Sequence, residues 1–184
     1  ADEWLASRFN NLIKSISQKF DDCQFSAAAE ELYEFSWHEL ADWYIEVSKL
    51  EKNFELLKAY YLDLLKLWHP LIPFITETIW QSFVDGRLLL VEPWPKTNEK
   101  LINSKAETEF SIIKNLVTEI RNYRAQEKLD WKNISEAKIY SPKWQELLDS
   151  QSAIIEHLAK TKISFSDKKI KSPKIKLKEI EVEI

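Results

Sequence analysis

The chain has 184 residues, with 30 acidic and 26 basic side chains and a net charge of −4 at pH 7. A single glycine and a single cysteine exclude glycine-rich phosphate loops, a disulfide framework and a multi-cysteine zinc site. Apolar residues make up 45% of the sequence, enough for a sizeable core, yet no apolar run is long enough to span a bilayer.

The first half of the chain predicts amphipathic helices. Residues 3–20 carry apolar side chains at helical spacing, which indicates a first helix. A polar turn over residues 21–25 follows. Ser26 is then expected to be the N-cap of a second helix that reaches about residue 50, because its hydroxyl can accept a hydrogen bond from an orphan backbone amide.

The stretch from Tyr60 to Phe83 is the most hydrophobic part of the sequence. Pro70 and Pro73 interrupt it, since proline lacks an amide donor and disfavours helix in the residue before it. Pro73 suits the first turn of a new helix. We therefore expect two helices, about 53–68 and 73–83, that form a hairpin at the centre of a helical bundle.

After this hairpin, residues 88–91 are expected to be extended, and residues 103–128 form a fifth helix. The sequence thus predicts an antiparallel helical bundle over residues 1–133. The pattern then changes to a strand over 137–140, a helix from Pro142 to about residue 160 and a strand over 163–165, and the strictly alternating last ten residues predict one further strand. We expect residues 134–184 to form a small α/β appendage. With no methionine in the sequence, the chain is expected to be an internal piece of a longer protein.

No catalytic or metal-binding pattern is found in the sequence. The three histidines, His38, His69 and His157, lie far apart without metal-ligand spacing. No nucleophile stands beside a candidate base. We expect that this chain alone is not an enzyme, and that it is cytoplasmic, because it has one cysteine and no signal peptide.

Four segments in order carry a resemblance to a known family. They are ELADWYIEVSK (39–49), WHPLIPFITETIW (68–80), EPWP (92–95) and EIRNYRAQ (119–126). Together they resemble the anticodon-binding region of the valyl-tRNA synthetases, a class I family, and the opening WLASRFN (4–10) resembles that family's first helix. The break at the prolines is shared with the isoleucyl and leucyl enzymes, whereas DWY favours the valyl enzymes.

The resemblance implies recognition of the valine tRNA anticodon by the bundle. The expected partners are tRNA and the rest of the synthetase chain, with no DNA and no membrane. No cofactor is expected here, because ATP is used by a catalytic domain that this chain lacks. Loop bases are read by stacking on aromatic or guanidinium planes, and phosphates by basic side chains. The residues expected to contact tRNA are Arg8, Phe25, Arg121, Asn122 and Arg124.

Each of these residues also has a purely structural interpretation. Phe25 could be a hydrophobic staple, although the fourth helical position after Ser26 is Glu30, which is not apolar. Arg8 could form a surface ion pair. Arg121 and Arg124, near the end of the fifth helix, could interact favourably with the negative end of the helix dipole.

Two alternative functions remain open at this stage. The first 95 residues carry 16 acidic and 8 basic side chains, which is poor for RNA binding and favours a helical protein-interaction module. The other alternative is the same module from an isoleucyl or leucyl enzyme.

Overall fold

The computed structural model describes residues 1–129, 134–177 and 179–184. These residues form two compact units, Ala1–Glu107 and Thr108–Ile184. They are mainly helical, with a small mixed sheet in the second unit, which confirms the predicted fold class. The predicted domain boundary, after residue 133, borders the residues that are not described and stays a prediction.

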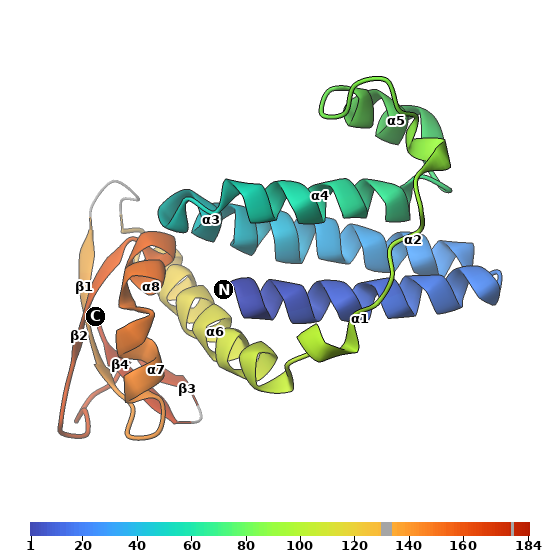
Figure 1. Ribbon diagram of the computed structural model, residues 1–184. Helices are drawn as coiled ribbons and strands as arrows, with labels where there is room; N and C mark the ends of the chain where they lie inside the picture. The colour runs from blue at the N-terminus through green and yellow to red at the C-terminus, as the bar shows by residue number, and fades with distance from the viewer. Residues whose placement is uncertain (130–133, 178) are drawn as a thin grey trace. The chain divides into compact units, whose positions relative to one another are not determined.

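Three helical rods lie side by side in the first unit (Figure 1). The first is α1 (Asp2–Asp21), and the third is α4 (Phe54–Trp68). The second rod is continuous from α2 (Phe25–Glu34) through η1 (Phe35–Tyr44) to α3 (Ile45–Glu51). Its middle portion, η1, is a π-helix, a wider form that hydrophobic periodicity does not predict.

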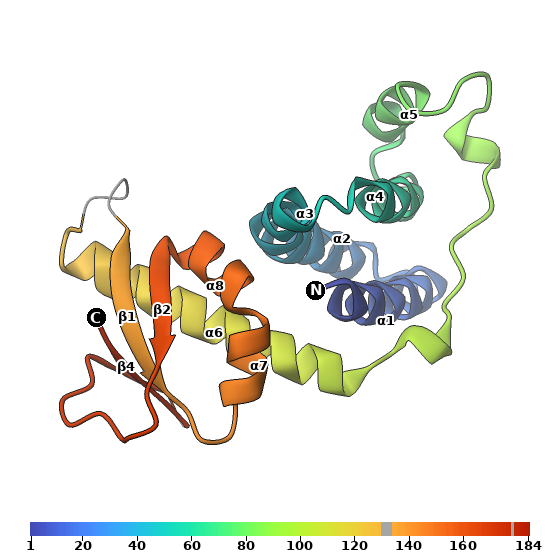
Figure 2. The same ribbon diagram turned by 60° about the vertical axis from the view of Figure 1, so that its left-hand side comes forward.

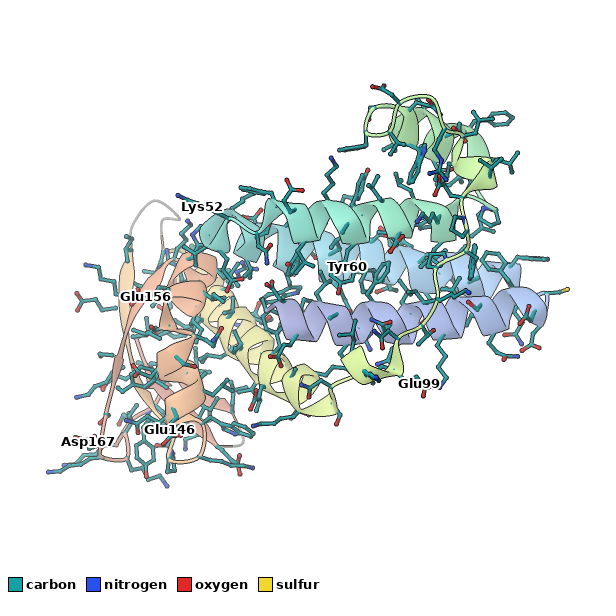
Figure 3. All side chains as sticks on the ribbon, in the orientation of Figure 1. Lys52, Tyr60, Glu99, Glu146, Glu156 and Asp167 are labelled. Atoms are coloured by element: carbon teal, nitrogen blue, oxygen red, sulfur yellow. The ribbon has the colours of Figure 1, made fainter. Side chains whose placement is uncertain are left out.

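Aromatic side chains join the three rods in their core. Phe9 of α1 is buried, with its ring centroid 5.6 Å from that of Phe35 and 5.0 Å from that of Tyr60. Tyr60 lies between α4 and the rods below it (Figure 3). One ring on α1 therefore contacts both other rods, so this contact organises the first unit.

The helix α5 (Pro73–Gln81) begins at Pro73 as predicted, but it is not at the centre of the bundle. It lies beside the C-terminal half of α4, on the side away from α1 (Figures 1 and 2), where Trp80 packs with Leu65 and Leu89 in a small separate cluster. Phe74 on α5 is 88% exposed. The predicted helical hairpin therefore forms, but its predicted place at the centre of the bundle is wrong, because an apolar run shows what can be buried but not what covers it.

The segment after α5 folds back onto this small cluster. Residues 88–91 are not extended as predicted: Leu89–Val91 forms a 3-10 turn, η2, which packs against α5. The carboxylate of Glu77 accepts hydrogen bonds from Gln81 Nε2 at 2.7 Å and from the Leu89 amide at 3.0 Å. These bonds fix η2 to the helix.

The same bonds lower the pKa of Glu77 below its ordinary value of 4.5, with the Gln81 bond as the main cause. A lowered folded-state pKa contributes stability above the unfolded value, and that stability is lost as the pH falls through the folded value. We expect the Leu89 amide resonance to titrate with a midpoint below that of an unstructured glutamate. NMR measurement of this amide across the acid range tests the expectation, and the pH-dependent shift should vanish in Glu77→Gln.

The chain then returns along α1. Three polar side chains on one stripe of α1 bond the returning segment in reverse order. Ser17 accepts from the Trp94 indole at 2.8 Å, and Asn10 accepts from the Asn98 amide at 2.7 Å. Ser7 accepts from the Asn103 amide at 2.8 Å. These three polar residues of α1 thus hold residues 94–103 antiparallel to α1, through the 3-10 turn η3 (Glu99–Leu101).

The second unit is a sheet with helices on one side (Figures 1 and 2). Among the described residues the strand order is β2-β1-β4-β3, in which β1 and β2 are parallel and the other pairs antiparallel. Ala137 and Ile139 of β1 are buried, and Lys138 between them is exposed. The elements are α6 (Ser104–Gln126), β1 (Ser135–Tyr140), α7 (Gln145–Ser150), α8 (Ser152–Ala159), β2 (Thr161–Phe165), β3 (Ile175–Leu177) and β4 (Ile180–Glu183).

Residues 108–126 of α6 group with the second unit, and the predicted bundle over residues 1–133 stays a prediction. Two other predictions for this part need correction. The helix expected over 142–160 is divided at Gln151 into α7 and α8. The alternating C-terminal stretch is not one strand but two, β3 and β4, paired antiparallel. Alternation of polar and apolar residues predicts which side chains share a face, but it does not show where the chain reverses direction between two strands.

Candidate nucleic-acid interface

Two aromatic side chains flank the tight turn between α1 and α2. Cys23 in this turn adopts a left-handed backbone conformation, with φ of 57°, which lets the chain reverse within a few residues. The ring centroids of Phe20 and Phe25 lie 5.9 Å apart across the turn. Phe25 is 51% exposed, so its ring is accessible to a ligand.

The start of α2 differs from the prediction. Gln24, not Ser26, is the N-cap: its carbonyl accepts a hydrogen bond from the Ala28 amide at 3.0 Å, so helical bonding has already begun before Ser26. Phe25 is therefore the first helical residue rather than the residue before the cap. The staple geometry does not apply to it. Its role as a stacking residue stays a prediction.

A third ring joins this pair from a distant part of the sequence. Trp94 packs edge to face on Phe20, with centroids 5.6 Å apart and ring planes at 83°. Its indole N–H donates to Ser17 on α1, which fixes the orientation of the ring. We call Phe20, Phe25 and Trp94 the aromatic cluster. Accessible aromatic rings at one end of a bundle are suited to stacking unpaired bases.

Arg8 lies elsewhere on α1. It is about 18 Å along the helix axis from Phe20, at 1.5 Å per residue. Its guanidinium donates two short bonds to Glu39, at 2.7 and 2.9 Å, and lies 3.8 Å from Glu107. The bond to Glu39 is the main reason that the pKa of Arg8 is raised. This bidentate pair ties α1 to η1, so the ion-pair interpretation of Arg8 is supported, and its contact with tRNA stays a prediction.

The other three predicted residues lie on α6, in the second unit. Arg121 donates to the Leu158 carbonyl at 3.0 Å. Arg124 is buried, at 2% exposure, and donates to Ser135 Oγ and to the Lys160 carbonyl. Asn122 is exposed. The structure thus directs two of the three side chains into the packing of the second unit, and we do not include Arg124 in the proposed RNA surface.

The charge around the aromatic cluster is unfavourable for phosphates. The first unit carries 18 acidic and 11 basic side chains, a net charge of −7. Two aspartates, Asp21 and Asp22, stand in the turn itself. Lys19, one residue from Phe20, is paired with Glu31. Any RNA contact at this place must therefore rely on base stacking and base edges more than on the backbone.

Sequence reasoning missed Phe20 and Trp94 as members of the site. Trp94 belongs to the EPWP segment that carries the family resemblance, yet nothing local in that segment indicates where its ring packs. A tryptophan between two prolines, in a segment unsuited to a regular helix, was the available signal.

The described residues include no group of three or more histidine, cysteine, aspartate or glutamate side chains that could hold a metal ion. No helix in the described part of the chain is long and apolar enough to cross a membrane. The first unit is thus a set of helical rods with accessible aromatic rings at one end, and such rings can stack unpaired bases.

Comparison with known proteins assigns the family. Residues 2–140 match the family described as the anticodon-binding domain of tRNA ligase. The chain belongs to this family, and the resemblance found in the sequence is confirmed.

Similar curated proteins are valine–tRNA ligases. That of Pseudothermotoga lettingae is 36% identical over 179 residues, covering 92% of this chain and 20% of the relative. That of Fervidobacterium nodosum is 38% identical over 134 residues, with 68% of this chain and 16% of the relative covered. That of Legionella pneumophila (strain Lens) is 32% identical over 184 residues, covering 87% of this chain and 19% of the relative. The chain thus spans about a fifth or less of the length of these relatives.

Proposed function

We propose that this chain is the anticodon-recognition module of a valine–tRNA ligase. In this proposal it binds the anticodon loop of valine tRNA and positions that tRNA for aminoacylation by a catalytic domain outside this chain. The observation that carries the proposal is the aromatic cluster at the α1–α2 turn, in a chain of an anticodon-binding family. The names of its relatives favour valine over isoleucine or leucine.

The proposal also covers partners and location. The partners are valine tRNA and the remainder of a ligase polypeptide, and the place of action is the cytoplasm, where tRNA is charged for translation. No cofactor is assigned to this chain, since ATP would be used by the catalytic domain.

A protein-interaction module is the competing function. Two observations favour it: the net charge of −7 on the first unit and the exposed apolar residues of α5, with Phe74 the most exposed. The two functions differ in their response to salt. Each phosphate contact adds roughly −0.7 to −0.9 to the slope of log K against log salt concentration, whereas an apolar protein contact has little salt dependence.

Titration of labelled anticodon stem-loops tests the proposal. We expect the valine stem-loop to bind more tightly than those of isoleucine and an unrelated tRNA, with affinity that falls as salt rises. Phe25→Ala should weaken binding of the valine loop by about 1–3 kcal/mol, because a stacked ring is lost. The chain offers a matched control in Phe54, which opens α4 as Phe25 opens α2 and is 54% exposed.

Phe54→Ala should leave the RNA affinity unchanged. Equal binding of all three stem-loops, or equal losses in the two phenylalanine variants, would contradict recognition at the aromatic cluster. A salt-independent affinity, or none at all, would favour the protein-interaction module.

A further inference from the structure

Lysine side chains gather in the second unit, around the connection between β2 and β3. Residues 160–176 include seven lysines and one acidic residue, Asp167. The second unit carries 15 basic and 12 acidic side chains, a net charge of +3, whereas the first unit has a net charge of −7. The cations that the aromatic cluster lacks are therefore present in the same chain, in the other unit.

The connection is held against the sheet rather than extended into solvent. The Ser166 amide donates to a carbonyl of β1, and the Lys174 amide donates to a carbonyl of β4, each at 2.8 Å. Between these two bonds, the Ile170 amide donates to Glu181 at 3.3 Å, and the Ile170 side chain is buried. Because both ends and the middle of the connection are fixed, its lysines lose less freedom on binding than those of a mobile loop would.

A pocket of about 580 Å³ opens between this connection and the exposed face of the sheet. Asp167 marks the connection in Figure 3. Four lysines and two carboxylates contribute the charges of the lining, which gives an excess of positive charge. These residues are Lys138, Lys168, Lys169 and Lys171, with Asp167 and Glu183. We call this site the lysine pocket.

Most of these lysines are not committed to an ion pair. Lys138 is exposed on β1, on the face of the sheet that the helices do not cover. Lys169 lies 3.8 Å from Glu181, yet its side chain is 76% exposed. Within the described part of the chain, no carboxylate lies at ion-pairing distance from Lys138, Lys168 or Lys171. Each ammonium is a compact charge with three donors, which suits the oxygens of a phosphate group.

The composition of this surface favours RNA over a membrane. A protein that binds a lipid surface combines its cations with exposed apolar side chains that insert among the acyl chains. Among the described residues that line the lysine pocket, only Phe165 and Ile170 are apolar. The first is partly buried and the second is buried, so neither is free to insert. A sugar–phosphate backbone needs only cations and polar donors.

We propose that the lysine pocket binds the sugar–phosphate backbone of tRNA, as a sequence-independent contact separate from base recognition. The inference rests on the proposed function for its ligand, since tRNA is the source of the phosphate groups. Phosphate contacts position a nucleic acid, while base contacts specify it. The second unit thus supplies electrostatic attraction and the first unit supplies discrimination, which explains how an acidic helical unit can belong to a chain that binds RNA.

Salt titration of full-length tRNA tests the proposal. The probes are labelled transcripts of valine tRNA and of an unrelated tRNA, bound by the unchanged chain and by a triple variant with Lys168→Gln, Lys169→Gln and Lys171→Gln. Glutamine keeps a long polar side chain but removes its charge. The slope of log K against log salt concentration should become less steep by about 2, because three phosphate contacts contribute roughly 0.7 each. The change should be the same for both tRNAs.

The matched control removes three exposed lysines of the first unit, through Lys49→Gln, Lys58→Gln and Lys100→Gln. It changes the net charge by the same amount, and it should keep the slope of the unchanged chain. A thermal melt of each variant verifies that it is folded, which we expect because all the substituted side chains are exposed.

The two carboxylates of the lysine pocket allow a test of opposite sign. They compete with phosphate for the lysines, so the double variant Asp167→Asn, Glu183→Gln should bind both tRNAs about two- to fivefold more tightly, the scale of surface charge interactions. Unchanged or weaker binding by this double variant would contradict a phosphate site in the pocket.

Vesicles of phosphatidylserine and phosphatidylcholine are the second probe. The unchanged chain should not bind them at a salt concentration at which it binds tRNA. Vesicle binding that the triple lysine variant loses would assign the pocket to a membrane surface and overturn the proposal.

The outcomes separate this inference from the proposed function. If the triple lysine variant keeps the original salt slope, or if the control variant lowers it equally, the phosphate contact is overturned, while binding that still depends on Phe25 leaves the proposed function standing. If the lysines matter but valine tRNA binds no better than the unrelated tRNA, the phosphate contact stands and the valine assignment fails. If neither tRNA binds, both are overturned.

Discussion

Replacing Phe9 with alanine should lower the free energy of unfolding of the helical unit by about 3–5 kcal/mol, the usual cost of deleting a buried aromatic ring. Phe9 is 1% exposed, and its ring contacts Phe35 and Tyr60 on the other two rods. The deletion opens a cavity where three helices meet, and neighbouring side chains can fill it only in part because each is held on its own rod. Urea unfolding followed by far-UV circular dichroism measures the loss.

The same alanine substitution at Phe54 is the control. Phe54 is more than half exposed, and we expect its loss to change the unfolding free energy by no more than about 0.5 kcal/mol. A loss below about 1 kcal/mol for Phe9→Ala would show that the rods are held together by other contacts. Since Phe9 lies on the same helix as Phe20, the result also indicates how firmly the aromatic cluster is supported.

Arg124→Ala should destabilise the second unit by about 2–4 kcal/mol. The guanidinium bridges the starts of the two parallel strands, through Ser135 at β1 and the Lys160 carbonyl just before β2. Its removal leaves buried acceptors without a charged donor and a space where the side chain was. Chemical unfolding monitored by the NMR signals of β1 and β2 would measure this loss directly.

Asn122, two residues earlier on α6 and exposed, provides the matched control, and Asn122→Ala should leave stability unchanged. We further expect Arg124→Ala, at a temperature where it remains folded, to bind the valine stem-loop with unchanged affinity. A variant that melts normally but loses RNA binding would mean that Arg124 contacts tRNA after all and that its packing role is minor.

The amino-acid sequence by itself determined the class of fold, the family and the ends of several helices. Apolar spacing of three and four residues predicted α1 and α4 closely, and Pro70 and Pro73 predicted the break and the start of α5. These features depend on local backbone chemistry, which acts within one or two turns. The family was recognisable for a related reason, because its motifs are short local runs in a set order.

Only the tertiary structure decided which side chains meet. Trp94 lies 77 residues from its partner Ser17, and no local pattern in EPWP indicates that its ring would join the aromatic cluster at the end of α1. Arg124 resembled a surface cation, yet it is buried because two strand ends offer acceptors that a sequence does not place together. The apolar run of α5 predicted burial, but α5 lies outside the bundle. Periodicity assigns a face to a helix, whereas the partner of that face depends on contacts between residues far apart in the chain.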